Sequence, residues 1–196
     1  MRRLFVIIFL LPGALFLGCG GVKNIIEEKA ISARTDIFRE MQAEEALSKG
    51  FSDLLIRAQL KTHLEGHYIL EPRGSFHGKP KYPFVFNVDG QAIIWEVDGK
   101  KEDMPEYDDN GIKTQDGGEG MRYSLDKRIR LAVGPHKIFF ALPGDKYYVQ
   151  FEVILEERSI YTLEFKPIYN RYRNISQDYL RGIKRYEIFL NEKRLL

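Results

Sequence analysis

The feature that most constrains the fold of this chain is an alternation of apolar and polar residues that recurs from position 56 to near the C-terminus. Successive side chains of a strand point to opposite faces, so a period of two indicates a strand with one buried face. The clearest run covers residues 147–155, and similar runs cover 56–64, 84–88, 93–97, 129–133, 138–142, 161–169 and 186–190. The pattern therefore predicts a mainly β chain.

Turn-forming residues separate these runs. Asp-Gly pairs at 89–90 and 98–99 predict tight hairpins, since glycine tolerates the positive φ that such turns require. Gly134-Pro135 and Pro143-Gly144-Asp145 interrupt the pattern further along the chain. Short strands joined in this way predict an antiparallel β-sandwich of seven to eight strands over residues 51–196, closing with a C-terminal strand at 183–191.

A helical period precedes the strands. Residues 22–49 contain no proline or glycine, and apolar or small residues recur every three or four positions at Ile26, Ala30, Ala33, Ile37 and Met41. Asn24 suits the start of a helix and Gly50 suits its end. We expect an N-terminal α-helix within residues 19–50 that either spaces the domain from the N-terminus or lies lightly against it, with a partner-binding coiled coil as an alternative.

The first 18 residues have the three parts of a secretory signal peptide. Arg2 and Arg3 precede an apolar run over 4–17, and the small residue Gly18 follows it. The run is shorter than the ~20 residues of a membrane-spanning helix. We therefore expect residues 1–18 to be removed, with an uncleaved anchor helix as the alternative.

The segment Leu15-Phe16-Leu17-Gly18-Cys19 resembles the lipobox of bacterial lipoproteins. The resemblance implies cleavage before Cys19, attachment of lipid to its sulfur, and anchoring of the protein to a membrane of the cell envelope. Gly20, in place of aspartate, implies the outer membrane, with the domain facing the periplasm. Cys19 is the only cysteine, which excludes disulfides within the chain.

A second resemblance covers residues 84–167. Val88-Asp89-Gly90, the stretch 128–138 that contains Gly134 and His136, and Tyr161-Thr162-Leu163-Glu164-Phe165 resemble the PEGA-like and transthyretin-like β-sandwich modules of bacterial envelope proteins. The resemblance implies a binding or scaffold unit rather than an enzyme.

Charge and motifs exclude several functions. The chain has 30 basic and 28 acidic residues, and loss of Arg2 and Arg3 would leave 28 of each. Such a balance gives no electrostatic reason to bind nucleic acid. The sequence contains no Gly-x-Ser-x-Gly, no phosphate-binding Gly-Lys-Ser/Thr loop and no His-Glu-x-x-His. We therefore expect no catalytic residue and no cofactor.

Two groups of residues are candidate metal sites. His63 and His67 would be about 13 Å apart if their strand continued through both, too far to share one ion, and His77 follows ten residues later. Solvated or hydrogen-bonded histidines are the favoured interpretation. The polar loop 102–120 offers an irregular calcium site through Asp108, Asn110, Asp116 and Glu119, although a solvated acidic loop is the simpler interpretation.

Aromatic and basic residues meet at Tyr169, Arg171, Tyr172 and Arg173. Tyrosine and arginine are enriched at binding interfaces, so this cluster is a candidate partner surface. The alternative is a connector whose tyrosines cover the edge of the sheet.

Together these features predict a lipid-anchored envelope module that binds or scaffolds an envelope protein or glycan. One alternative is an envelope hydrolase or metal-dependent enzyme whose site includes loop 102–120. The other is a carrier that holds a small apolar ligand between two sheets.

Overall fold

The computed structural model describes residues 21–42, 45–72, 74–104, 107, 110–111, 116–171 and 178–196. The predicted signal peptide 1–18 and Cys19 lie outside these residues. In chain order the elements are α1 (Val22–Lys29), β1 (Phe38–Met41), β2 (Phe51–Thr62), β3 (Lys81–Val88), β4 (Gln91–Glu102), β5 (Gly120–Ala132), β6 (Gly134–Leu142), β7 (Tyr147–Leu155), β8 (Ile160–Tyr169), the 3-10 helix η1 (Asp178–Arg181), β9 (Ile183–Leu190) and β10 (Lys193–Arg194).

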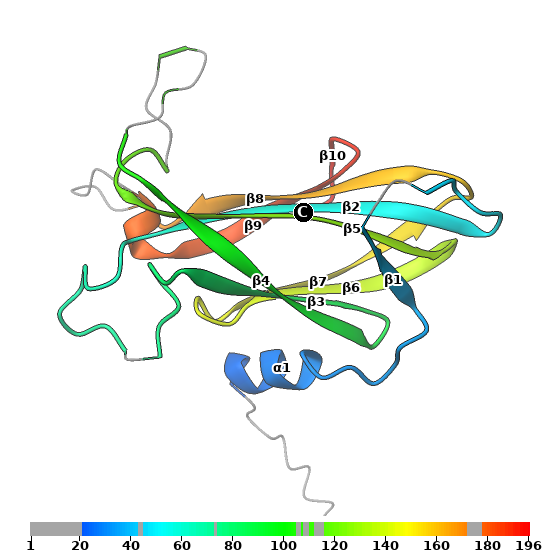
Figure 1. Ribbon diagram of the computed structural model, residues 1–196, viewed down its shortest axis with the longest axis horizontal. Coiled ribbons are helices and arrows are strands. Elements are labelled where there is room, and N and C mark those ends of the chain that lie inside the picture. The colour runs from blue at the N-terminus through cyan, green and yellow to red at the C-terminus, as the bar shows by residue number, and fades with distance from the viewer. Residues whose placement is uncertain are drawn as a thin grey trace, which may run out of the picture.

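The ten strands of the described residues belong to one curled sheet. Its order is β10-β9-β8-β2-β5-β4-β3-β6-β7, with β1 paired to β5. The sheet curls into a half-barrel, in which β8, β2 and β5 face β3, β6 and β7 across the core (Figure 1). The mainly β prediction is confirmed. The predicted antiparallel sandwich of seven to eight strands is wrong, because the described residues form ten strands and β2 pairs in parallel with β8.

The length of β4 explains why the sheet does not split into two. Its first part pairs with β3, and its last residues, from Gly99 to Glu102, pair with β5 in the other layer. A hairpin at Asp98-Gly99 was predicted, and this prediction is wrong. Gly99 instead lies within the strand, where an added Cβ would be 2.7 Å from Cγ of Met121. The hairpin at Asp89-Gly90 is confirmed, with φ values of 49° and 93°.

Aromatic side chains fill the space between the two layers. Phe140 of β6 stacks on Phe165 of β8 with ring centroids 4.1 Å apart, and Tyr186 of β9 meets Phe140 edge-on. Phe84 and Phe86 contribute from β3, and all five side chains are buried. This packing explains the period of two in the sequence, because alternate residues of each strand face the core.

The helix is much shorter than predicted. It ends at Lys29, and Phe38–Met41 forms strand β1 against β5. The interpretation of 22–49 as one helix is wrong because hydrogen bonds to the sheet outweigh the helical period. The side chain of Gln91 accepts hydrogen bonds from the backbone N–H groups of Ile37 and Phe38, at 2.7 and 3.1 Å.

Helix α1 packs on the outside of the β3–β6 layer (Figure 1). Ile26 is only 3% exposed and belongs to a small core with Val85, Phe139 and Ala141. The side-chain amide of Asn87 donates a hydrogen bond of 2.8 Å to the carbonyl of Lys29. These contacts fix the helix to the body. No helix in the described part of the chain is both long and apolar enough to cross a bilayer.

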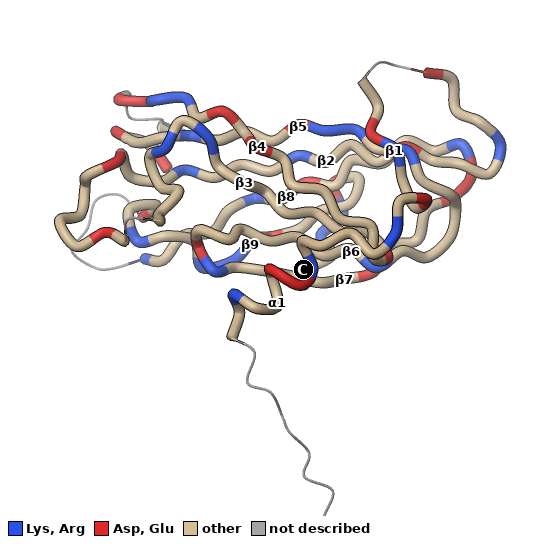
Figure 2. The backbone as a smooth tube through the Cα atoms, turned by 60° about the horizontal axis from the view of Figure 1, so that its bottom comes forward, with Lys and Arg blue, Asp and Glu red and all other residues tan. Residues whose placement is uncertain are grey.

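Charged residues are interspersed along the strands, as the blue and red segments of Figure 2 show. One pairing is buried. Asp53 of β2 is fully buried and accepts hydrogen bonds from Arg128 and Arg130 of β5. Arg130 also donates 2.9 Å hydrogen bonds to the carbonyls of Glu45 and Ala46, so it ties the segment before β2 to the sheet.

Candidate functional site

The loop that joins β2 to β3, residues 63–80, forms the first wall of the candidate site. Its two ends meet: the backbone N–H of Gly78 donates a 3.0 Å hydrogen bond to Oγ1 of Thr62. Gly78 has a φ of +69°, and an added Cβ there would overlap the backbone of Glu65. Tyr123 of β5 donates a 2.6 Å hydrogen bond to the carbonyl of Lys79. The loop is therefore closed at its base and fixed to the sheet.

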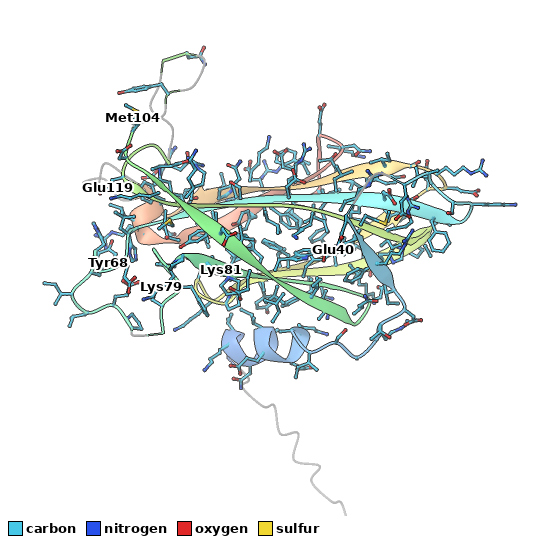
Figure 3. The ribbon with its side chains drawn as sticks, in the orientation of Figure 1. Glu40, Tyr68, Lys79, Lys81, Met104 and Glu119 are labelled. Carbon is cyan, nitrogen blue, oxygen red and sulfur yellow. The ribbon has the colours of Figure 1, made fainter. Side chains whose placement is uncertain are left out.

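A groove of about 1130 Å³ lies between this loop, helix α1, the β6–β7 turn and η1. Its apolar lining includes Ile26, Tyr68, Leu70, Phe76 and Leu180. Figure 3 shows Tyr68 and Lys79 in the loop at the end of the molecule farthest from β1. Leu70 is 94% exposed, so the rim presents apolar surface to solvent. A concave, mostly apolar surface with a few polar groups is the usual form of a ligand site.

A chain of polar contacts runs along the groove. Nδ1 of His77 lies 3.1 Å from Nε2 of His63, and Nε2 of His77 lies 3.3 Å from Oδ2 of Asp145. The same Asp145 oxygen accepts a 2.6 Å hydrogen bond from Oη of Tyr82. His63 and Tyr82 are buried, whereas His77 is half-buried. This series of polar contacts thus connects the sheet core to the groove.

The neighbours of each imidazole indicate where its protons lie. Nδ1 of His63 lies 2.9 Å from the carbonyl of Leu64 and so carries the proton, which leaves Nε2 to accept from His77. Burial lowers the pKa of His63, and the neighbouring charge of His77 lowers it further. Burial alone would lower the pKa of His77, but the hydrogen bond and charge of Asp145 outweigh it and raise that pKa. Nδ1 of His77 faces the accepting Nε2 of His63, and Nε2 of His77 faces a carboxylate, so both nitrogens of His77 are placed to donate.

Glu71 adds a carboxylate with an unsatisfied hydrogen-bond acceptor. Its Oε1 is buried and has no hydrogen-bond partner among the described residues. The same oxygen lies 3.5 Å from Nε2 of His63, an atom that already accepts a proton from His77. One donor atom from each of His63, Glu71 and His77 lies within 4.8 Å of the other two, the one such group of three in the described part of the chain.

The predicted separation of His63 and His67 is wrong. Strand β2 ends at Thr62, and the chain then turns, so the two imidazole rings stack with centroids 5.5 Å apart. The His63–His77 contact spans fourteen residues of irregular loop, and no strand or helix period predicts such a contact. The only signal in the sequence was the density of histidine and glutamate between positions 63 and 77.

The candidate calcium residues are engaged elsewhere or not described. Oδ2 of Asp116 accepts a 2.7 Å hydrogen bond from Arg122. The side chain of Glu119 is 62% exposed and lies 3.7 Å from Nζ of Lys101. Asn110 is exposed, and Asp108 lies outside the described residues. The calcium site stays a hypothesis with no new support.

The candidate partner surface loses one of its members. Tyr169 is buried, and its Oη accepts a 2.8 Å hydrogen bond from the backbone N–H of Lys61. The interpretation of Tyr169 as a surface residue is therefore wrong, because the β8 register turns it into the core. Arg171 is exposed and lies 3.2 Å from Asp178. Tyr172 and Arg173 lie outside the described residues.

Comparison of the chain with protein families, with curated proteins and with solved structures found no match.

Proposed function

We propose that this chain is a lipid-anchored module of the bacterial cell envelope that binds an envelope protein or glycan in the groove beside α1. One observation carries the proposal: α1 begins at Val22 and is packed on the body through Ile26, which also lines the groove. Cys19 precedes Val22 by three positions, a span of at most about 11 Å. Lipid on Cys19 would therefore hold the groove close to the membrane surface.

The lining of the groove supports a binding role. Tyr68 and Phe76 offer partly exposed aromatic rings at its rim, and His77, Asp145 and Arg181 offer polar groups. Aromatic rings bind apolar side chains and the faces of sugars, and the polar groups fix the orientation of a ligand. Restriction to a surface raises the local concentration of the module for a partner on the same surface.

The resemblance to lipoproteins and to PEGA-like modules points in the same direction. It implies an outer-membrane location facing the periplasm and a scaffold or binding role. The carrier alternative gains no support from the groove, which lies at an end of the sheet, whereas aromatic side chains pack between the layers.

A single labelling experiment tests this proposal. The full-length gene is expressed in its bacterial host, and a photo-reactive amino acid replaces Leu70 at the groove rim. A matched control places the same probe at Asp126, an exposed residue of β5. We expect a crosslinked envelope protein or glycan from position 70 and not from position 126. Equal labelling from both positions, or none, would count against the groove.

The anchor is tested separately by Cys19→Ala. The wild-type protein should fractionate with membranes and carry a lipid adduct on Cys19 by mass spectrometry. The variant should be released from the membrane and lack the adduct. A variant that stays membrane-bound to the same extent would remove the anchor from the proposal.

The His63, Glu71 and His77 group favours a second candidate, a metal-dependent envelope enzyme. Loop 102–120, the site first expected for it, does not supply this group.

A further inference from the structure

The donor atoms of the polar cluster are spaced as ligands of one small cation would be. Nδ1 of His77 and Nε2 of His63 are 3.1 Å apart, and Nε2 of His63 and Oε1 of Glu71 are 3.5 Å apart. Ligands placed tetrahedrally at the usual zinc distances are separated by about 3.3 Å from one another. One donor atom from each of the three side chains lies within 4.8 Å of the other two.

The other nitrogen of each imidazole is already oriented by an acceptor. Nδ1 of His63 faces the carbonyl of Leu64, and Nε2 of His77 faces the carboxylate of Asp145. Metal-binding histidines almost always donate their second N–H to a backbone carbonyl or a carboxylate, which fixes the tautomer and the ring plane. The cluster contains one acceptor of each kind, and Tyr82 in turn orients Asp145.

The unpartnered oxygen of Glu71 indicates what the cluster lacks. A buried carboxylate oxygen without a hydrogen bond is costly, and here it faces a nitrogen that has no proton to give. A cation between Oε1 of Glu71, Nε2 of His63 and Nδ1 of His77 would satisfy all three atoms. It would take the place of the proton that His77 now shares with His63.

We infer that His63, Glu71 and His77 bind one divalent transition-metal ion, and that Zn²⁺ is the best fit. Two imidazoles and one carboxylate suit zinc, whereas calcium and magnesium prefer sites built from oxygen ligands alone. All three side chains line the groove, so a fourth coordination position would open toward it. A ligand in the groove could then contact the ion directly. The inference does not depend on the lipid anchor.

Metal titration of the full-length, untagged protein in detergent, after removal of metal by a chelator, tests the inference. We expect one Zn²⁺ per chain by calorimetry. Glu71→Gln is the main variant because it removes the charged ligand without removing any hydrogen bond of Oε1. It should weaken binding at least tenfold, and His77→Gln should weaken it further. Asp145→Asn should weaken it about 10- to 100-fold through loss of the oriented imidazole.

Two control variants separate the site from general effects. Glu65→Gln changes a carboxylate of the same loop that pairs with Lys79 at the surface. His136→Gln changes a histidine held by Asp89 as His77 is held by Asp145, but on β6. Both should bind Zn²⁺ as the wild type does. Absorption of bound Co²⁺ in the visible range should report a low-coordinate site in the wild type and should change in Glu71→Gln.

Two results would overturn the inference. One is the absence of a stoichiometric zinc site, and the other is an equal zinc affinity of the wild type and a folded Glu71→Gln. Near-ultraviolet circular dichroism confirms the fold of each variant before titration. Because Cys19→Ala should retain zinc binding, failure of the metal site and failure of the membrane proposal are measured independently.

Discussion

Tyr82 donates a 2.6 Å hydrogen bond to Oδ2 of Asp145, so a residue of the sheet core orients a carboxylate at the groove. Tyr82 is fully buried, and burial, with the nearby charge of Asp145, raises its pKa well above the usual value. The phenol therefore stays a donor at any physiological pH. Asp145 follows Pro143-Gly144 in the β6–β7 turn, and an added Cβ on Gly144 would lie 2.6 Å from Oη of Tyr82. The turn thus packs closely on the tyrosine.

Tyr82→Phe should remove the hydrogen bond that connects Asp145 to the core. Loss of a hydrogen bond to a charged group should lower the free energy of unfolding by about 1.5–3 kcal/mol, measured by urea denaturation. Zinc affinity should fall about tenfold, because Asp145 would no longer hold His77 in place. Tyr186→Phe is the control: it removes a hydrogen bond from a buried tyrosine to the carbonyl of Gln59, outside the cluster. If both variants changed zinc affinity equally, the Tyr82–Asp145 contact would have no special role.

The buried ion pairs of Asp53 predict that the free energy of unfolding depends on pH. Burial alone would raise the pKa of Asp53, but hydrogen bonds from Arg130 and Arg128 outweigh it and hold the pKa below its usual value. Because the folded-state pKa is the lower one, this stability is fully present above the unfolded-state value of about 3.9. It is lost as the pH falls through the folded-state pKa.

Urea denaturation of the wild type and Asp53→Asn between about pH 2.5 and 7, a range that spans the ordinary aspartate pKa, measures this effect. At neutral pH the variant should be less stable by about 3–5 kcal/mol, since it leaves two arginines of a buried network without their carboxylate. The difference between the two proteins should shrink as the pH falls below about 4. A difference that stayed constant with pH would show that Asp53 is not charged in the folded protein.

The β-rich architecture could be predicted because the period of two survives wherever one face of a strand meets the core. Runs around residues 84–88, 138–142 and 147–155 correspond to β3, β6 and β7, whose buried residues alternate or are nearly continuous. Strand order could not be predicted. Nothing local indicates that β4 continues through Asp98-Gly99 into a second layer, because glycine is favoured there by the close approach of Met121 and Tyr123 from β5.

Local sequence patterns predict the N-terminal helix and the candidate site less well than they predict the strands. Apolar residues at Ile37 and Met41 continue a helical period, yet Phe38–Met41 pairs with the edge of β5. The His63–His77 contact depends on the closure of a loop at Gly78, and Glu71 reaches the cluster from within the same loop. Such contacts follow from tertiary packing rather than from spacing.

The packing of α1 on the sheet predicts a local effect of Ile26→Ala. An eight-residue helix is not stable alone in water, so its contacts with Val85 and Phe139 must hold it. Loss of this side chain should cost about 2 kcal/mol locally and speed amide exchange in 22–29 about thirtyfold. Ile31→Ala is the control, since Ile31 is 71% exposed. Unchanged amide exchange in Ile26→Ala would mean that neither the helix nor the groove wall that it forms depends on this contact.

The most direct measurement is X-ray diffraction at the zinc absorption edge from crystals of the protein grown with one equivalent of Zn²⁺. We predict a single anomalous peak between His63, Glu71 and His77, with nitrogen and oxygen ligands at about 2.0–2.2 Å. Clear density for the three side chains with no peak between them, or with the bound zinc at a different place on the protein, would contradict a metal site in the groove.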